Sequence, residues 1–378
     1  MKAVHRQAWF KLVLVVLLCS LSFAAGGWFQ SRRGGLEEKL IRGAYRQIAE
    51  NSLYNQQSGI ELAYAAVRGM LGVTGDAYAE LIEPGAASNF MNTFAGRTGV
   101  VGLYAENRDR QVVITIVYPD GPAERAGVQV GDVILAIDGA RLDQTVDSSE
   151  AGLLMRGEPG TELKLRILRG SRELEFNLQR EERNFVSARM LPSGAGYLSL
   201  TAFNRIAVEQ MRENLDLLLA QDPSGLVWDL RNNEGGDMQA AQEILSLFID
   251  DGLLFSASLT RERVVEFRAK GGAPASELPL VVLIDQTSYS AAETCAAAVA
   301  ETGRGVTLGS ATYGKGVIQA TIPLEEGAML QMTIAKWLSP GGEWYDGRGV
   351  APMVDMLDDP ATATDELLEK AVDILLAK

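Results

Sequence analysis

The fold is decided by the stretch Val281-Val-Leu-Ile-Asp-Gln-Thr-Ser-Tyr-Ser-Ala-Ala-Glu-Thr-Cys-Ala-Ala-Ala-Val299. Its first residues form an apolar run typical of a buried strand, and its alanine-rich half predicts a helix. Ser290 therefore stands at a strand-to-helix turn, where free N–H groups and the helix dipole can stabilise a developing oxyanion. The same serine also begins a capping box with Glu293, and Ser288 is a second candidate for the helix cap.

Strands and helices alternate around this turn from about residue 185 onward. The expected strands cover 196–200, 225–230 and 278–285, and the expected helices cover 207–220, 238–249 and 291–301. This alternation predicts an α/β layered fold with a largely parallel sheet. A final amphipathic helix over 364–376 is expected to pack on this core.

Histidine is almost absent from the chain. The single histidine is His5, ahead of the first apolar run, so none is available to a folded core. This excludes Ser-His-Asp and Cys-His catalysis, and it argues against zinc, as do two cysteines, Cys19 and Cys295, without metal-binding spacing. A nucleophilic serine would need another base, for which a deprotonated lysine is the main candidate.

Lys315 lies between two glycines, after an apolar run at 305–308 and before an alternating run at 317–322. A lysine acts as a base only where burial lowers its pKa, and Gln319 is placed to orient its amine. Taken alone, a Gly-Lys-Gly turn is more often a solvated surface turn. The stretch 309–315 also matches a phosphate-binding loop, but Gly316 replaces the Ser or Thr that would hold magnesium, so the nucleotide-binding interpretation is rejected.

A second glycine loop follows the strand at 225–230, in Asp229-Leu-Arg-Asn-Asn-Glu-Gly-Gly-Asp237. Paired glycines after a strand form a loop whose N–H groups can face a ligand oxygen, as in an oxyanion hole. The alternative is an ordinary loop in which Asp237 caps the next helix.

Together these motifs resemble the carboxyl-terminal processing, or tail-specific, serine proteases. The resemblance is carried by the glycine loop 229–236, the turn 288–293 and the lysine motif 312–319, and the 25-residue interval between Ser290 and Lys315 matches the family and selects Ser290 over Ser288. It implies a crotonase/ClpP-like protease core, with Ser290 as nucleophile, Lys315 as base and Gln319 orienting the lysine. Its oxyanion hole would use the amides of Gly235 or Gly236 and of Ala291.

Three positions depart from the family pattern. Tyr289 and Ala292 replace an alanine and a serine beside the nucleophile, and Met353 stands where an aspartate is usual. None of these changes removes a catalytic group, although Tyr289 is expected to narrow the cleft.

The stretch 121–139, Gly-Pro-Ala-Glu-Arg-Ala-Gly-Val-Gln-Val-Gly-Asp-Val-Ile-Leu-Ala-Ile-Asp-Gly, resembles a bacterial PDZ domain. Such domains take the free C-terminus of a peptide as an added strand and hold its carboxylate with the N–H groups of a glycine loop. The candidate loop is Gly99-Val100-Val101-Gly102. The resemblance implies a mainly-β PDZ domain over 96–181, inserted before a protease core over 185–378, and substrates with free apolar C-termini.

The N-terminus predicts export. Basic residues precede an uncharged apolar stretch that begins at Leu12, and small residues follow it, as in a signal peptide cleaved near Ala24. The uncharged window to Ser31 is also long enough for an uncleaved membrane anchor. Residues 1–35 are thus a signal peptide or an anchor, and residues 36–95 form a helical region by their apolar spacing.

Charge narrows the range of partners. The formal net charge of −14 argues against nucleic acid, since phosphate binding needs clustered lysine and arginine. The prediction is an exported cell-envelope serine endopeptidase, gated by its PDZ domain, with a Ser-Lys dyad and neither metal nor cofactor. The rival is a catalytically silent PDZ adaptor on the same scaffold, which would bind peptides without turning them over.

Overall fold

The computed structural model describes residues 35–377 apart from 109, 119–120, 143–147, 260–262, 359–361 and 363. The predicted signal or anchor, residues 1–35, lies outside the described residues but for Gly35. Within the described part, no helix is both long and apolar enough to cross a bilayer. The chain divides into two compact units, Met1–Asp76 and Ala77–Lys378.

The described part of the first unit is a pair of helices, α2 (Leu36–Asn51) and α3 (Gly59–Gly72). Ser58 and Glu61 form a capping box at the start of α3, and the Tyr45 hydroxyl donates to the carbonyl of Gly59 at 3.1 Å. The predicted helical region continues into the second unit only in part. There a short strand, β1 (Glu80–Ile82), precedes a third helix, α4 (Pro84–Phe94).

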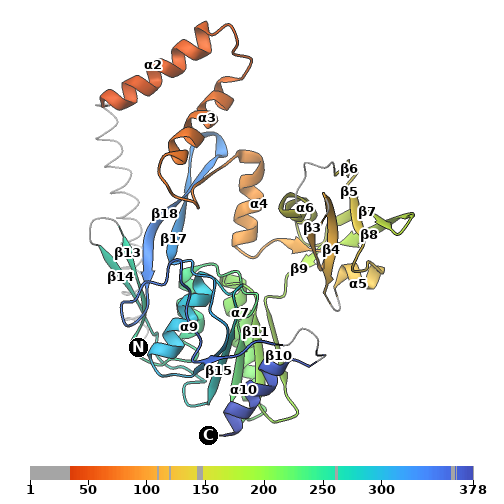
Figure 1. The fold of residues 1–378 in the computed structure, drawn as a ribbon, viewed down its shortest axis with the longest axis vertical. Helices are drawn as coiled ribbons and strands as arrows, with labels where there is room; N and C mark the ends of the chain where they lie inside the picture. The colour runs from red at the N-terminus through yellow and green to blue at the C-terminus, as the bar shows by residue number, and fades with distance from the viewer. Residues whose placement is uncertain are drawn as a thin grey trace, which may run out of the picture. The chain divides into compact units, whose positions relative to one another are not determined.

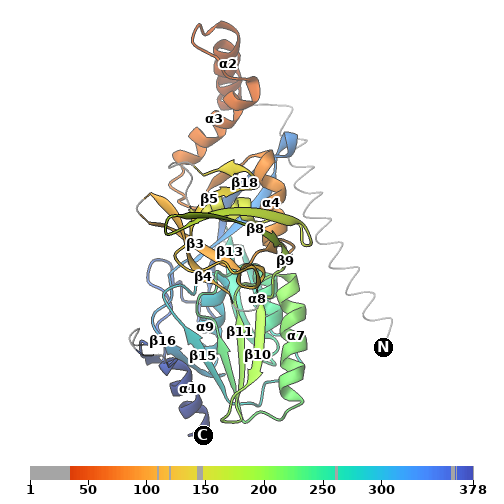
Figure 2. The same cartoon turned by 90° about the vertical axis from the view of Figure 1, so that its right-hand side faces the viewer.

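The core that follows residue 185 is built on a six-stranded sheet (Figures 1 and 2). Its order is β10 (Val186–Met190), β11 (Gly196–Leu200), β12 (Leu226–Asp229), β15 (Leu280–Ile284), β16 (Val306–Gly309) and β19 (Val354–Asp355). Only β10 runs antiparallel to its neighbour, and the other neighbours pair in parallel. The carboxyl ends of the parallel strands therefore lie at one edge of the sheet.

Helices cover both faces of this sheet, as the alternation along its strands requires. Val282 and Trp228 point to the face covered by α7 (Arg205–Leu219), α8 (Met238–Leu245) and α9 (Ala291–Glu301). Val281 and Leu283 point to the opposite face, where α10 (Glu366–Leu376) packs. The predicted α/β layered fold is confirmed, because each strand supplies alternate side chains to two apolar cores.

A second sheet supplies the lysine motif. Its path is β1, β18 (Met329–Leu338), β13 (Leu253–Leu259) and β14 (Val264–Arg268), and β17 (Val317–Pro323) pairs with β18. The β17–β18 pair is an antiparallel hairpin around the short helix η2 (Glu325–Gly327). Lys315 precedes β17 and Gln319 lies on it, so the hairpin fixes the spacing of both side chains.

The mainly-β module that precedes the core has the sheet order β3 (Leu103–Arg108), β4 (Gln111–Val117), β5 (Val133–Ile137), β7 (Glu162–Arg169) and β8 (Arg172–Gln179), with β6 (Ala140–Arg141) beside β5. Two helices, α5 (Pro122–Ala126) and α6 (Ser148–Met155), complete it. Ile114, Leu165 and Ile167 are fully buried in its core. A two-stranded ladder, β2 (Gly99–Val100) with β9 (Glu181–Glu182), joins its two ends.

Candidate active site

Ser290 lies at the N-cap of α9 in an unusual backbone conformation. Its φ and ψ angles are 59° and −116°. An ordinary N-cap residue has extended angles, so this turn is strained for a serine. Ser290 is partly exposed, whereas α9 behind it is buried from Ala291 to Val299. The strand-to-helix turn thus presents one hydroxyl at the edge of the sheet.

Ser288 has a different environment from Ser290. Its side chain is fully buried, and its hydroxyl donates to the carbonyl of Leu230 at 2.7 Å and accepts from the N–H of Asp285 at 3.0 Å. A hydroxyl bound on both sides and closed to solvent cannot meet a peptide. The geometry therefore favours Ser290 as the serine that faces a substrate.

Glu293 connects the serine turn to the lysine loop. Its side chain is fully buried, and its Oε2 accepts from the backbone N–H groups of Ser290 and Lys315, each at 2.8 Å. Its Oε1 accepts from the Thr312 hydroxyl and the Gly314 N–H, both at 2.6 Å. The sequence suggested only the helix-cap contact, because the three donors in the lysine loop lie about twenty residues further on.

Lys315 is held by its backbone and presents its amine to a neutral partner. Its carbonyl accepts from the Trp337 indole N–H at 2.7 Å, and its Nζ donates to Gln319 Oε1 at 2.9 Å. The Gln319 amide in turn donates to the carbonyl of Tyr78 at 2.8 Å. Burial lowers the pKa of Lys315 below its usual range, against an opposing effect of the Glu293 charge.

The structure brings Lys315 and Gln319 into direct contact, but not Lys315 and Ser290. Among the hydrogen bonds of the described residues, none joins the Ser290 hydroxyl to the Lys315 amine. Catalytic hydrogen bonds are often long or poorly aligned before substrate binds, so the lack of this bond in the free protein is compatible with a dyad.

The glycine loop lies directly against the serine turn. A Cβ built on Gly235 would come within 2.6 Å of the Tyr289 carbonyl oxygen and 2.8 Å of Ser290 Cβ, and the φ of Gly235 is +74°. Only glycine meets both conditions without strain. The loop and the turn are therefore as close as an oxyanion hole requires.

The amides of this loop differ in their availability. The Gly235 N–H donates to Asn233 Oδ1 at 2.8 Å, so in this conformation it is not directed at a substrate. Within the described chain, no acceptor binds the N–H of Gly236 or of Ala291. Of the two glycines that the sequence left open, Gly236 is the better donor beside Ala291.

Two residues of the loop motif anchor it, and the sequence did not assign them a role. Asn233 is fully buried, and its side-chain amide donates to the carbonyl of Leu200 at 2.7 Å. Its backbone carbonyl accepts from the Tyr289 N–H at 3.2 Å. Arg231 donates to Asp229 at 2.6 Å and to Asp365, the N-cap of α10, at 2.7 Å. These contacts tie the loop to the sheet, to the serine turn and to α10.

The candidate carboxylate loop of the preceding module is partly used by the fold itself. The Gly99 N–H donates to the Gly157 carbonyl at 2.7 Å, and the Val101 carbonyl accepts from Ala123 at 2.9 Å. Gly99 and Val100 form β2, so they are not free loop residues. The N–H groups of Val101 and Gly102 donate to no residue that the structure describes, which leaves them as the available pair.

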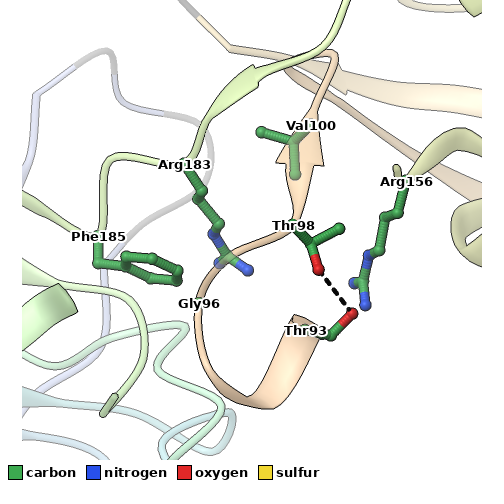
Figure 3. A pocket seen from close by; sticks show the side chains of 7 residues that line it. All are labelled: Thr93, Gly96, Thr98, Val100, Arg156, Arg183 and Phe185. Carbon is green, nitrogen blue, oxygen red and sulfur yellow. Dashed lines mark hydrogen bonds between the residues drawn. The ribbon is translucent and has the colours of Figure 1, made fainter. Parts of the chain in front are cut away.

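A small pocket opens beside this loop (Figure 3). The guanidinium groups of Arg156 and Arg183 point into it from either side of Thr98. Burial lowers the pKa of Arg156, the nearby Glu234 carboxylate opposes this effect, and the Arg183 charge adds to it. The other lining residues are Thr93, Gly96, Val100 and Phe185. Two cations in one partly buried pocket favour an anionic ligand.

Comparisons relate the chain to known proteins. Residues 194–356 match the model of Peptidase family S41, and residues 99–179 match that of the PDZ domain. The chain is 32% identical to the carboxyl-terminal-processing protease of Synechocystis sp., with 82% of this chain and 74% of the relative covered. It is 32% identical to carboxyl-terminal-processing peptidase 3 of Arabidopsis thaliana, with 84% of this chain and 65% of the relative covered.

A solved structure gives the same result at the level of the fold. The photosystem II D1 C-terminal processing protease superposes with a TM-score of 0.57 at 26% identity, with 90% of this chain and 98% of that chain covered. The chain spans about two thirds to three quarters of the length of the two curated relatives.

Proposed function

Because this chain belongs to the carboxyl-terminal-processing proteases, which are S41 serine peptidases with a PDZ domain, we propose that it is an exported endopeptidase with a Ser290–Lys315 dyad. The PDZ domain would bind the free, apolar C-terminus of a protein or peptide substrate. Export and a place in the cell envelope, free or membrane-anchored, are proposed from the basic and apolar pattern of residues 1–35.

The proposed dyad rests on the environments of two side chains, Ser290 and Lys315. Ser290 is a partly exposed hydroxyl on a strained turn, and Lys315 is a half-buried lysine whose amine meets a neutral amide. Burial without a carboxylate partner is what makes a lysine deprotonate near neutral pH. A lysine in a surface turn would not need to be half-buried, and a serine that only caps a helix would not need a strained backbone.

The steps follow from the positions of these groups. The neutral amine of Lys315 takes the proton of Ser290 as the serine oxygen attacks the substrate carbonyl carbon. The N–H groups of Gly236 and Ala291 stabilise the oxyanion, helped by the N-terminus of α9. The lysine ammonium then protonates the leaving amine, and water hydrolyses the acyl-enzyme by the same route in reverse.

Gln319 serves this cycle as an acceptor for the lysine. Its amide group is fixed by its bond to the Tyr78 carbonyl, so its Oε1 faces Nζ in one orientation. An acceptor without charge orients the amine and leaves its pKa low. A carboxylate at the same place would hold Lys315 protonated.

The test is proteolysis of an unfolded protein by purified wild type, Ser290→Ala and Lys315→Ala. We expect both variants to lose about a thousandfold or more in kcat/KM, because dyad members act as a unit. Lys336→Ala, which removes a lysine of β18 outside the proposed machinery, should leave the rate unchanged. Equal cleavage by wild type and both dyad variants would refute the dyad, and peptide binding without any turnover would identify an adaptor.

A further inference from the structure

Aromatic rings, in addition to Gln319, surround the amine of Lys315. Its Nζ lies 4.8 Å from the centroid of the Tyr78 ring and 5.6 Å from that of the Tyr289 ring. Both distances fall within the range of cation–π attraction. The Tyr289 ring packs in turn on Tyr313, at 5.6 Å between centroids, and the Tyr289 N–H donates to Asn233. The ring beside the amine is therefore fixed by the serine turn itself.

A ring face attracts the ammonium form of a lysine far more than its neutral form. The negative face of the ring stabilises a positive charge, whereas a neutral amine gains only a weak contact. The two tyrosines thus oppose the effect of burial, which favours the neutral amine. The ring faces therefore favour the proton that Lys315 must lose for catalysis, while burial favours its loss.

Other charged groups also lie near the lysine loop. The Glu293 carboxylate, on α9, favours the ammonium form. Asp346 binds the neighbouring Gly316 N–H at 2.8 Å, and Lys336 lies opposite Val317 on β18. Burial raises the pKa of the Tyr289 phenol, so this ring stays neutral over the working range. The Tyr289 ring therefore acts through its face and not through a phenolate charge.

We propose that Tyr289 and Tyr78 are positioning residues whose ring faces favour the ammonium form of Lys315, and that they set the pH at which the base becomes available. The proposal rests on the proposed function, in which Lys315 is the base. Tyr289 is one of the positions at which the chain departs from the family pattern.

The first test is the pH dependence of kcat/KM. Cleavage needs the neutral amine, so kcat/KM rises with pH through the pKa of Lys315. In Tyr289→Leu, which keeps an apolar side chain but no ring face, we expect the acid limb to move to lower pH by about half a unit to one unit. On that limb the variant then cleaves about three to ten times faster than wild type. Tyr289→Phe keeps the ring face and should retain the wild-type limb.

An acid limb that stays in place in Tyr289→Leu, or that moves to higher pH, would overturn the proposal. So would a Tyr289→Phe profile that shifts as far as that of Tyr289→Leu, because the hydroxyl and not the ring face would then be responsible. Tyr78→Leu repeats the test on the second ring should Tyr289→Leu fail to fold.

A second measurement does not depend on turnover. The pKa of the Lys315 amine is followed by NMR of 13C-labelled lysine in the Ser290→Ala protein, with Lys315→Arg to assign the signal. A lower pKa in the Tyr289→Leu or Tyr78→Leu background supports the contact even if the protein cleaves nothing. An unchanged pKa in an active protease overturns this inference and leaves the dyad standing. A lowered pKa with full activity of Lys315→Ala overturns the role of Lys315 as base.

Discussion

At Ser290 the chain holds a serine where the backbone angles suit glycine. Such a conformation costs about 1–3 kcal/mol and persists only where the surroundings impose it. Glu293 binds the Ser290 N–H, and Asn233 binds the N–H of Tyr289 just before it. The proposed nucleophile is thus placed by hydrogen bonds to backbone N–H groups of its own turn.

Glu293→Gln tests this placement at the scale of one residue. The carboxylate accepts four hydrogen bonds, whereas an amide has one oxygen and an NH₂ group that repels the facing donors. We expect kcat to fall about a hundredfold or more and the free energy of unfolding to fall by about 2 kcal/mol, because buried donors lose their partners. Steady-state kinetics and urea unfolding measure the two effects.

Glu301→Gln is the matched control, on the same helix but at its exposed end, where the carboxylate binds the Tyr345 hydroxyl and the Gly341 N–H. It should keep wild-type kcat. A Glu293→Gln protein with wild-type kcat would show that the serine turn and the lysine loop hold their positions without this carboxylate.

At the scale of elements, the site is a contact between two loops that follow neighbouring strands. The glycine loop follows β12 and the serine turn follows β15, and these strands pair in parallel. Parallel pairing brings both carboxyl ends to one edge, so the loops meet by topology. Gly235 is the point of closest approach.

Gly235→Ala tests that approach. A Cβ there would meet the Tyr289 carbonyl and Ser290, in addition to the strain of a positive φ. We expect a loss of about a hundredfold in kcat/KM, since a shift near 1 Å at the reacting centre has effects of this size. Gly303→Ala is the control, because its φ of +70° carries the same strain while nothing lies within 4 Å of the added methyl. Equal activity of the two variants would argue against tight loop contact.

Much of these elements could be predicted from sequence, because their patterns are local. The apolar run that begins at Val281 predicted a buried strand, and the Ser290–Lys315 interval marked the two candidate groups. Other features depend on contacts between distant segments. Tyr78 reaches Gln319 across 241 positions, and Gly99 lies in a strand because Gly157 and Glu182 pair with it. No local pattern carries such information.

At the scale of the whole molecule, the proposed recognition of a peptide and its proposed cleavage belong to different parts of the sequence. The pocket with Arg156 and Arg183 lies beside the predicted carboxylate loop, well separated in sequence from Ser290. A free substrate C-terminus carries a negative charge that an amidated one lacks. The charge of this pocket should therefore distinguish the two substrates.

We expect amidation of a substrate peptide to raise KM about tenfold or more, since a charged hydrogen bond contributes about 1.5–3 kcal/mol. Arg156→Gln should weaken binding of the free acid and remove most of the difference between the two peptides. Arg172→Gln, on the exposed end of β8, should preserve it. Equal KM values for acid and amide with the wild-type protein would refute recognition of the free C-terminus.

Arg231 binds a carboxylate that is synthesised long after it. Asp365 follows it by 134 positions, which at about 5–20 residues per second is a delay of roughly seven to twenty-seven seconds. During that time the glycine loop lacks one of its anchors, and α10 does not yet cover the sheet face below it. A chain synthesised only as far as Lys315 thus holds both groups of the proposed dyad but not yet the Asp365 carboxylate that anchors the glycine loop.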